Sequence, residues 1–268
     1  MCWEGRGEGR PPVAAAVFRL LLLPVAPTDR LPMSVDKSGQ RVRRMFGEIA
    51  RRYDLLNHLL SLGIDRRWRR RTVRLAPPSD GGPVLDVCTG TGDLALAYWR
   101  AGRGEVRVVG ADFCHPMLVI GGKKSRRLGA DGQLTLVEAD AQHLPFADDR
   151  FEVVSVAFGL RNVSDTDLGL REMVRVCRPG GRVAVLEFSL PKFWPLRKLY
   201  GWYFRFVLPI VGQALARNRQ AAYNYLPQSV GEFPQREALV AQMERAGLTQ
   251  VQFHPFTFGI AILYVGVK

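Results

Sequence analysis

The sequence predicts an α/β fold built around a mainly parallel β-sheet. Two observations lead to this prediction: short apolar runs alternate with helical patterns from residue 83 onward, and a glycine-rich turn follows the first of these runs. Strands that alternate with helices are typical of βαβ units, in which the strands lie parallel. The 268 residues are 47% hydrophobic and 24% charged, so the chain can bury the core of one ordinary domain, and disorder of the whole chain is excluded.

Residues 1–32 differ in composition from the rest of the chain. A start rich in glycine, arginine and proline leads into two apolar runs, at residues 13–18 and 20–23. These runs are too short to span a bilayer, and the leading residues have little of the positive charge that a secretory signal carries. We expect residues 1–32 to be a non-native or flexible extension, with Met33 as the natural start. A functional presequence is the alternative.

Residues 33–78 are expected to form an N-terminal helical segment. Apolar residues recur there at three- and four-residue steps, which is the helical period. They are Val42, Met45, Phe46, Ile49, Tyr53 and Leu56. A cluster of Pro, Ser, Asp and Gly at 77–82 breaks the pattern, so we place the start of the main domain, residues 79–268, at this break.

The elements of the main domain follow in order along the chain. We expect strands at residues 83–87, 106–112, 133–138, 151–157, 182–188, 251–256 and 260–267. We expect helices at residues 93–100, 116–128, 166–177 and 235–246. The last two strands, split by Gly259, would pair as a terminal hairpin. Because a crossover needs only one helix, residues 190–234, which hold seven aromatic residues between Phe193 and Phe206, are expected to be an inserted helical cap.

The formal net charge of +13 is concentrated in two segments. Residues 41–74 carry a net charge of +8 and residues 192–219 carry +6, which leaves the remaining residues near neutrality. Such an excess indicates an anionic partner, either nucleic acid, a phospholipid surface or an acidic substrate.

Cysteine and histidine are sparse. The four cysteines form no CxxC pair, and the four histidines are isolated from one another. We therefore expect no metal site and no disulfide framework, which suits a reducing compartment.

The most informative stretch is the glycine-rich turn at Gly90-Thr91-Gly92, between an apolar strand and a helix start. Glycines let a backbone approach a ligand closely, and a helix N-terminus offers free N–H groups. Asp112 follows 22 residues after Gly90, at the end of the next expected strand. A carboxylate at that place can accept both ribose hydroxyls of an adenosine.

Two kinds of adenosine cofactor fit this turn. Gly90-x-Gly92-x-x-Ala95 also satisfies the dinucleotide fingerprint, so an NAD-type ligand stays open. Asp86 before the turn and Asp93 after it place negative charge where a pyrophosphate would lie. That charge favours S-adenosylmethionine, which presents an ammonium group and a sulfonium instead.

Several stretches resemble one known family. They are residues 45–57 with Tyr53-Asp54 and Asn57, residues 62–69, residues 84–95, Phe158-Gly159-Leu160-Arg161-Asn162-Val163, residues 186–189 and residues 223–227. From about Val42 to Lys268 the sequence resembles the menaquinone/ubiquinone-biosynthesis C-methyltransferases of the UbiE/MenG type, within the class I S-adenosylmethionine-dependent methyltransferases. The resemblance implies a Rossmann-like fold with a mainly parallel seven-stranded sheet and an antiparallel terminal strand, together with N-terminal helices and a helical cap.

The resemblance also implies where the cofactor binds. Asp86 belongs to the implied cofactor site. Thr91 and the backbone of Gly90 and Gly92 would hold the methionine end of the cofactor, and Asp112 would bind its ribose. Asp140 and Ala141 would border the adenine. Two positions depart from the family pattern: Cys88 stands at a position that is small in the family, and Ala157 replaces a serine that contacts the cofactor in some members.

By the same resemblance, the enzyme methylates a ring carbon of a polyprenylated quinol, demethylmenaquinol, to form menaquinol. Attack on the methyl group requires electron density from a quinol hydroxyl, whose charge must be stabilised. The expected catalytic residues are Tyr53, Asp54, Arg161 and Asn162. A guanidinium stays protonated in proteins, so Arg161 suits stabilisation of a developing quinolate. The alternative for Arg161 is a structural ion pair with Asp165 or Asp167, and Tyr53 either packs over the cofactor or fills the seam between the N-terminal helix and the sheet.

We expect the partners to be the lipid quinol and an anionic membrane surface, with a homodimer as a further possibility and no specific nucleic acid. The implied location is cytoplasmic and peripheral, at the inner face of the membrane. A ubiquinone precursor or another lipid or phenolic substrate is the alternative. A more remote alternative is nucleic-acid binding, which only the arginine-rich run at residues 66–71 supports.

Overall fold

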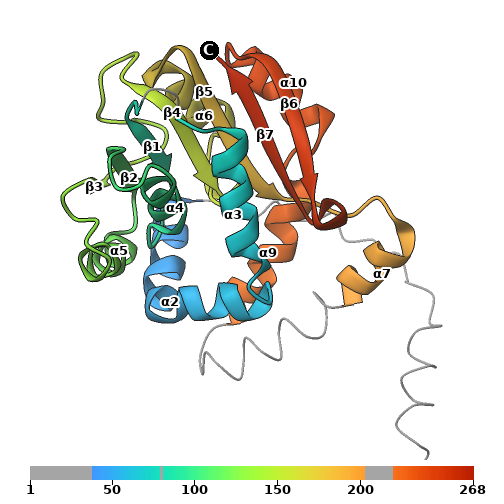
Figure 1. The fold of residues 1–268 in the computed structure, drawn as a ribbon. Coiled ribbons are helices and arrows are strands. Elements are labelled where there is room, and N and C mark those ends of the chain that lie inside the picture. Colours follow the sequence, from blue (N-terminus) through green and yellow to red (C-terminus); the bar gives the residue numbers. More distant parts are fainter. Residues whose placement is uncertain (1–37, 79–80, 203–219) are drawn as a thin grey trace, which may run out of the picture. The chain divides into compact units, whose positions relative to one another are not determined.

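The computed structural model describes residues 38–78, 81–202 and 220–268 (Figure 1). A seven-stranded sheet with the order β3-β2-β1-β4-β5-β7-β6 forms its centre. The strands are β1 (Val84–Val87), β2 (Val108–Asp112), β3 (Leu134–Glu138), β4 (Phe151–Ala157), β5 (Cys177–Phe188), β6 (Thr249–Phe256) and β7 (Ala261–Val267). The first five pair in parallel, whereas β7 runs antiparallel between β5 and β6. The predicted α/β class, with a mainly parallel sheet and an antiparallel terminal strand, is confirmed.

Helices precede, connect and follow these strands. They are α2 (Gly39–Leu60), α3 (Ile64–Leu75), α4 (Asp93–Ala101), α5 (His115–Arg127), α6 (Thr166–Val176), α7 (Trp194–Trp202), α9 (Gln220–Glu232) and α10 (Glu237–Arg245). Two short 3₁₀ turns, η1 (Leu160–Asn162) and η3 (Thr257–Gly259), follow β4 and β6.

The helices cover both faces of the sheet. On one face lie α3 and α4 (Figure 1). These helices bury Trp68, Leu94 and Tyr98 against the strands. On the other face, α6 and α10 contribute buried residues such as Met173 and Leu239. Successive residues of a strand point to opposite faces, so a sheet covered on both sides needs strands that are largely apolar. In β1, Val84, Leu85 and Val87 are buried, and so is the one polar residue, Asp86.

Most element boundaries lie within two residues of the sequence prediction, and two regions differ by more. The N-terminal helical segment expected at residues 33–78 is divided into α2 and α3 by a turn at residues 61–63. The strand expected to begin at Arg182 begins at Cys177, because Cys177 pairs with Phe151 before the register shifts and Arg182 pairs with Val153.

The two segments with unusual composition are only partly described. Residues 1–32 lie outside the described residues, as does much of the expected cap at 190–234, of which α7 and α9 are described. Within the described part of the chain, no helix is long and apolar enough to cross a lipid bilayer.

Candidate active site

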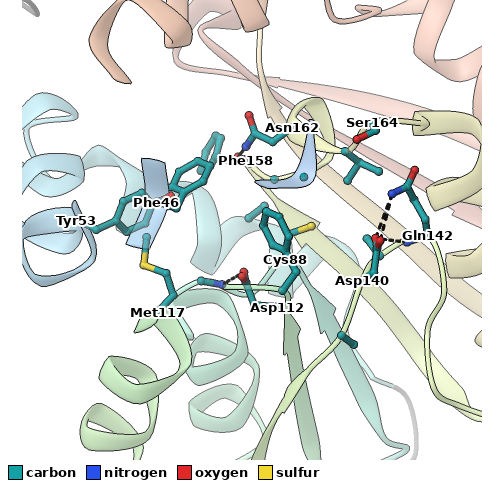
Figure 2. A pocket seen from close by; sticks show the side chains of 18 residues that line it. Phe46, Tyr53, Cys88, Asp112, Met117, Asp140, Gln142, Phe158, Asn162 and Ser164 are labelled. Carbon is teal, nitrogen blue, oxygen red and sulfur yellow. Dashed lines mark hydrogen bonds between the residues drawn. The ribbon is translucent and has the colours of Figure 1, made fainter. Parts of the chain in front are cut away.

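A pocket lies at the carboxyl ends of β1, β2 and β4, next to α2 and η1 (Figure 2). Its lining combines residues from these strand ends, from α2 and from the loop that follows β3. The lining residues are Gly39, Phe46, Tyr53, Cys88, Gly90, Asp112, Phe113, Met117, Ala139, Asp140, Ala141, Gln142, Ala157, Phe158, Gly159, Asn162, Val163 and Ser164. In an open parallel sheet, ligands bind at this edge because the crossover loops diverge there.

The glycine-rich turn is held by a buried carboxylate beneath it. Asp86 accepts hydrogen bonds from the hydroxyls of Thr89 (2.6 Å) and Ser155 (3.0 Å) and from the N–H of Ala95 (3.2 Å). Burial raises the pKa of the Asp86 carboxyl to about 7. Asp86 lies outside the pocket lining, so in this structure it fixes the turn and the start of α4.

Gly90 and Asp112 form the centre of the pocket. Gly90 takes a φ of +58°, which L-residues seldom adopt, and its N–H donates to Asp112 Oδ2 at 2.7 Å. The other oxygen of Asp112 accepts the N–H of Cys114 at 2.8 Å. Burial raises the pKa of Asp112 to about 6. Asp112, which the sequence analysis placed near the glycine-rich turn, therefore contacts that turn directly and faces the pocket.

Asp140 and Ala141 line the pocket on the side that follows β3. Asp140 Oδ1 accepts the backbone N–H of Gln142 at 2.9 Å, which fixes the orientation of the carboxylate. Figure 2 shows Asp140 and Gln142 on one side of the pocket, Tyr53 on the other and Asp112 between them. The lining thus offers an elongated ligand successive contacts from β1, β2 and the loop after β3.

Aromatic side chains from α2 form the opposite wall. The rings of Phe46 and Tyr53 meet edge to face with centroids 5.9 Å apart, and both pack near Met117 of α5. Tyr53 also lies against the turn, since a Cβ atom built on Gly90 would be 3.9 Å from Tyr53 Cε1. Burial raises the pKa of the Tyr53 hydroxyl, so it stays protonated. Tyr53 therefore lines the pocket and packs where α2 meets α5.

Two other residues expected at the site lie behind it, in a charged cluster. The Thr91 hydroxyl donates to Asp54 Oδ1 at 2.5 Å. Lys124 of α5 donates to Asp54 Oδ2 at 2.8 Å, to Thr91 at 3.0 Å and to Asp93 at 2.5 Å. Asp54 and Thr91 are thus absent from the described lining of the pocket, and Gly92 is as well. Their contacts tie α2 to the glycine-rich turn and to α5.

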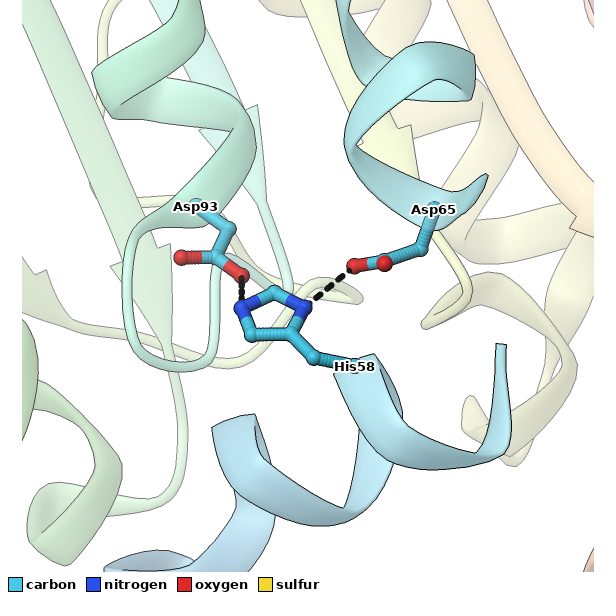
Figure 3. A group of neighbouring side chains, drawn as sticks. All are labelled: His58, Asp65 and Asp93. Carbon is cyan, nitrogen blue, oxygen red and sulfur yellow. Dashed lines mark hydrogen bonds and ion pairs between the residues drawn. The ribbon is translucent and has the colours of Figure 1, made fainter. Parts of the chain in front are cut away.

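A second set of ion pairs adjoins this cluster (Figure 3). His58 Nδ1 lies 2.8 Å from Asp65, and its Nε2 lies 3.9 Å from Asp93. These three side chains lie close enough to share a metal ion. Arg69 already pairs with Asp65 and lies 3.7 Å from Asp93, which also binds Lys124. Protein cations therefore already neutralise both carboxylates, and the arrangement serves as an ion-pair network.

Arg161 is buried beside the pocket and does not line it. Its guanidinium pairs with Glu187 at 2.8 Å and donates to the carbonyl oxygen of Phe158, while its backbone N–H donates to Glu187 at 3.2 Å. The structural partner considered from sequence, Asp165 or Asp167, is wrong: η1 turns the guanidinium toward the end of β5, and Asp165 instead caps α6. The guanidinium lies over the ring of Phe188, 5.3 Å from its centroid, and its charge is paired with Glu187.

Asn162, the residue after Arg161, does line the pocket. Its amide nitrogen lies 3.5 Å from the carbonyl oxygen of Phe158, and its Oδ1 is buried without a hydrogen-bond partner in the described structure. Buried acceptors are normally satisfied, so this oxygen is an unsatisfied polar group beside the pocket.

The two departures from the family pattern both line the pocket. Cys88 adopts a φ of +51°, a conformation that costs a non-glycine residue about 1 kcal/mol. Its Cβ would lie only 2.4 Å from a Cβ built on Gly159, so the glycine at 159 makes room for it. Burial raises the pKa of the Cys88 thiol well above its usual value, so it stays neutral. Ala157 offers only a methyl group at its position.

Several apolar residues of the lining are not among the site residues predicted from the sequence. Phe46, Phe158 and Gly159 lie inside the stretches that resemble the family, which is the signal that could have identified them. Met117 and Phe113 carry no such signal, because their place in the pocket depends on how α2 packs on α5.

The charge of the lining discriminates between the two cofactors considered from sequence. It holds the carboxylates of Asp112 and Asp140 and, among the described residues, no lysine, arginine or histidine. A pyrophosphate would meet like charge here, whereas a sulfonium and an ammonium group meet opposite charge. The negative charge of the pocket lining therefore fits S-adenosylmethionine.

The comparisons with known proteins agree with this chemistry. The family model described as the ubiE/COQ5 methyltransferase family matches residues 34–268. The chain is 46% identical over 232 residues to the Geobacter sulfurreducens protein named ubiquinone/menaquinone biosynthesis C-methyltransferase UbiE, and the match covers 87% of this chain and 90% of that one. It is 48% identical over 222 residues to the demethylmenaquinone methyltransferase of Thermus thermophilus, covering 83% and 99% of the two chains.

Among solved structures, the fold is similar to that of an S-adenosylmethionine-dependent methyltransferase from Thermotoga maritima, described as a possible histamine N-methyltransferase. The TM-score is 0.59 at 16% identity, over 84% of this chain and 98% of that one. Similarity at this level of identity shows a shared Rossmann-like fold.

Proposed function

This chain belongs to the ubiE/COQ5 methyltransferase family, and we propose that it methylates a ring carbon of demethylmenaquinol. It is an S-adenosylmethionine-dependent methyltransferase of quinone biosynthesis. The observation that carries the proposal is the composition of the pocket. One side is acidic and holds Asp112 and the glycine-rich turn, and the other is an aromatic wall that ends at the unpartnered Asn162 Oδ1.

The acidic side suits the cofactor. S-adenosylmethionine, when bound, supplies an electrophilic methyl group on a positively charged sulfur. Asp112, fixed by two backbone N–H groups, is oriented to accept the ribose hydroxyls. The Gly90 turn would hold the amino-acid end, and Asp140 with Ala141 would border the adenine.

The aromatic wall suits a quinol ring. Phe46, Tyr53 and Phe158 present apolar surface on which a flat ring can pack, and such packing orients the ring relative to the methyl group. Asn162 Oδ1 would accept the hydrogen bond of a quinol hydroxyl. The Arg161 guanidinium, which donates to the carbonyl oxygen of Phe158 and pairs with Glu187, would stabilise the negative charge that develops on the ring oxygen.

The lipid nature of this substrate supports a peripheral location, cytoplasmic at the inner face of an anionic membrane. Large apolar side chains are exposed at the α2–α3 turn, in η3 and at the start of α7. They include Leu62 (83% exposed), Phe258 (81%), Phe193 (67%) and Trp194 (64%). Exposed aromatic and aliphatic residues beside basic ones are typical of proteins that bind the membrane interface.

The test compares two acceptors with the purified full-length chain. Labelled S-adenosylmethionine is supplied with demethylmenaquinol or with the demethylated ubiquinol precursor, both with short isoprenoid tails in detergent. We expect label in the menaquinol product at a rate at least about tenfold above that for the ubiquinol precursor, a preference of the size that pocket contacts provide. Binding of the cofactor without transfer to demethylmenaquinol would overturn the proposal.

Asn162→Ala sharpens the same test. If Asn162 accepts the quinol hydroxyl, the variant should lower kcat/KM for demethylmenaquinol about tenfold, the effect of one neutral hydrogen bond, and leave the Kd of S-adenosylmethionine unchanged. An equal loss of cofactor affinity would place Asn162 on the cofactor side instead.

A further inference from the structure

A second hollow lies between α3 and α4, apart from the methyl-transfer pocket. Its volume is ≈ 820 Å³. Six cationic side chains line it: Arg66, Arg69, Arg70, Arg74, Arg100 and Lys124. The acidic residues in the same lining are Asp54 and Asp93. We call this hollow the arginine groove.

Two of the six cations already have protein partners. Lys124 bonds Asp54 and Asp93, and Arg69 pairs with Asp65. The groove's own carboxylates are therefore occupied. The other four cations are exposed, and within residues 38–78, 81–202 and 220–268 none of the ion pairs or hydrogen bonds involves their side chains.

The helix α3 concentrates these free cations on one side. Arg66, Arg70 and Arg74 are four residues apart, so they share a helix face at intervals of about 6 Å. The rest of the arginine-rich run is directed elsewhere: Trp68 donates to Thr257, and Arg71 lies over the ring of Phe256. Like charges four residues apart destabilise a helix, and a bound anion would remove that repulsion.

The chemistry of the groove excludes the two ligands of the methyl-transfer reaction. The cofactor is cationic and the quinol is neutral, so neither is attracted to four unpaired guanidinium groups. Guanidinium groups bind phosphate oxygens through paired N–H donors. The groove therefore suits a phosphate group.

The surface next to the groove indicates where that phosphate is found. Leu62, which is 83% exposed, lies at the turn before α3, one helical turn from Arg66, and Leu55 of α2 is 60% exposed. An apolar tip followed by a row of arginines is the arrangement with which peripheral proteins bind anionic bilayers. We propose that the arginine groove binds the phosphate of an anionic phospholipid. This inference rests on the proposed function in one respect: an enzyme with a lipid substrate works at a membrane.

The test is sedimentation of the full chain with vesicles, in the absence of cofactor and quinol. Vesicles of phosphatidylglycerol mixed with phosphatidylcholine are compared with phosphatidylcholine alone. Replacing Arg66, Arg70 and Arg74 together by glutamine should weaken binding to the anionic vesicles at least about tenfold. The matched control replaces Arg107, Arg171 and Arg245 by glutamine, three exposed arginines outside the groove, and should change binding less than about twofold.

Two further measurements separate the possible sources of phosphate and the two proposals. Binding of inorganic phosphate and of single-stranded RNA is measured on the same variants. If the groove variant loses affinity for RNA or phosphate and still binds vesicles like the unmodified chain, the lipid proposal is overturned. Equal loss in the groove and control variants also overturns it. Methyl transfer to a short-tailed quinol in detergent should be unchanged in the groove variant. A negative result for lipid binding would therefore not contradict the proposed methyl-transfer reaction.

Discussion

The methyl-transfer pocket and the arginine groove lie close together and have opposite charge. The pocket holds two carboxylates and, among its described lining residues, no cation, whereas the groove holds six cations and two carboxylates that are already paired. One helix reaches both: Tyr53 of α2 lines the pocket, and the next residue, Asp54, lines the groove. The net charge of the whole chain does not show this division. The pocket attracts cationic ligands, and the groove attracts anionic ones.

The two regions also differ in how they are held. Backbone N–H groups and buried hydroxyls fix Asp112 and Asp86, so the pocket depends on buried and partly buried hydrogen bonds. The groove depends on partly exposed side chains. Salt screens exposed charges far more than buried ones, so the groove should respond to ionic strength and the pocket should not.

The largest expected effect comes from Asp86, which supports the pocket from below. Asp86→Ala leaves two hydroxyls and one N–H without their acceptor in the core. An unsatisfied buried group costs about 1–3 kcal/mol, so we expect the free energy of unfolding to fall by about 3 kcal/mol or more. Urea denaturation measures it. Ser155→Ala, which removes one of these donors, should lower it by about 1 kcal/mol, and equal losses in the two variants would contradict the role of Asp86.

Replacing Asp112 tests the acidic side of the pocket. Asp112→Asn removes the charge that would accept two ribose hydroxyls, and we expect the Kd of S-adenosylmethionine to rise about 100-fold. Calorimetry measures it. Asp140→Asn is the matched control: this carboxylate is exposed, so its loss should raise the Kd less than about tenfold. A larger effect at Asp140 than at Asp112 would reverse the assignment.

Acid should weaken cofactor binding through the same residue. Burial raises the pKa of Asp112 from 3.8 to about 6, so the carboxylate gains a proton as pH falls through 6. The ionised fraction of Asp112 falls about tenfold from pH 7 to pH 5, and the affinity for the cofactor should fall with it. Asp112→Asn should lose the part of the profile near pH 6 and keep only the contribution of Asp86, whose pKa is about 7. A profile like that of the unmodified chain would assign the whole titration to another group.

The raised pKa has the opposite consequence for stability. The folded chain holds the Asp112 proton more tightly than the unfolded chain does. The contribution of Asp112 to stability is therefore complete below pH 3.8 and is lost as pH rises through about 6. Thermal melts between pH 4 and pH 7 measure this trend, as the difference in melting temperature between the unmodified chain and Asp112→Asn.

The smallest effect is expected where the two regions meet. Lys124 bonds Asp54, Asp93 and Thr91, and so links α2 to the glycine-rich turn. Lys124→Met should raise the KM for S-adenosylmethionine about threefold to tenfold by loosening the wall that carries Tyr53, with kcat little changed. Lys123→Met, at an exposed neighbour, is the control and should have no effect. Equal changes in both variants would mean that net charge, not the link, is responsible.

Local pattern predicted much of this fold, because strands and helices differ in period. It could not give the position of β7 between β5 and β6, since strand order is set by packing of segments distant in the chain. The break between α2 and α3 was also missed, because the apolar period continues across the turn.

The candidate site divides in the same way. Asp112 was placed by its distance from Gly90 along the chain, and the two groups share a hydrogen bond. The partner of Arg161 was not predictable, because Glu187 comes close only when η1 and the end of β5 meet. Likewise, nothing in the run of arginines at 66–71 shows that Arg69 is buried while Arg66 and Arg70 face a groove.

The chemical position of the transferred methyl group tests the central claim most directly. The purified chain is incubated with demethylmenaquinol and methyl-labelled S-adenosylmethionine, and the isolated product is examined by NMR and mass spectrometry. We expect the label on a ring carbon, formed by the unmodified chain and at a rate at least about 100-fold lower by Asp112→Asn at limiting cofactor. Label on a quinol oxygen, or no labelled quinol at all, would contradict C-methylation by this pocket.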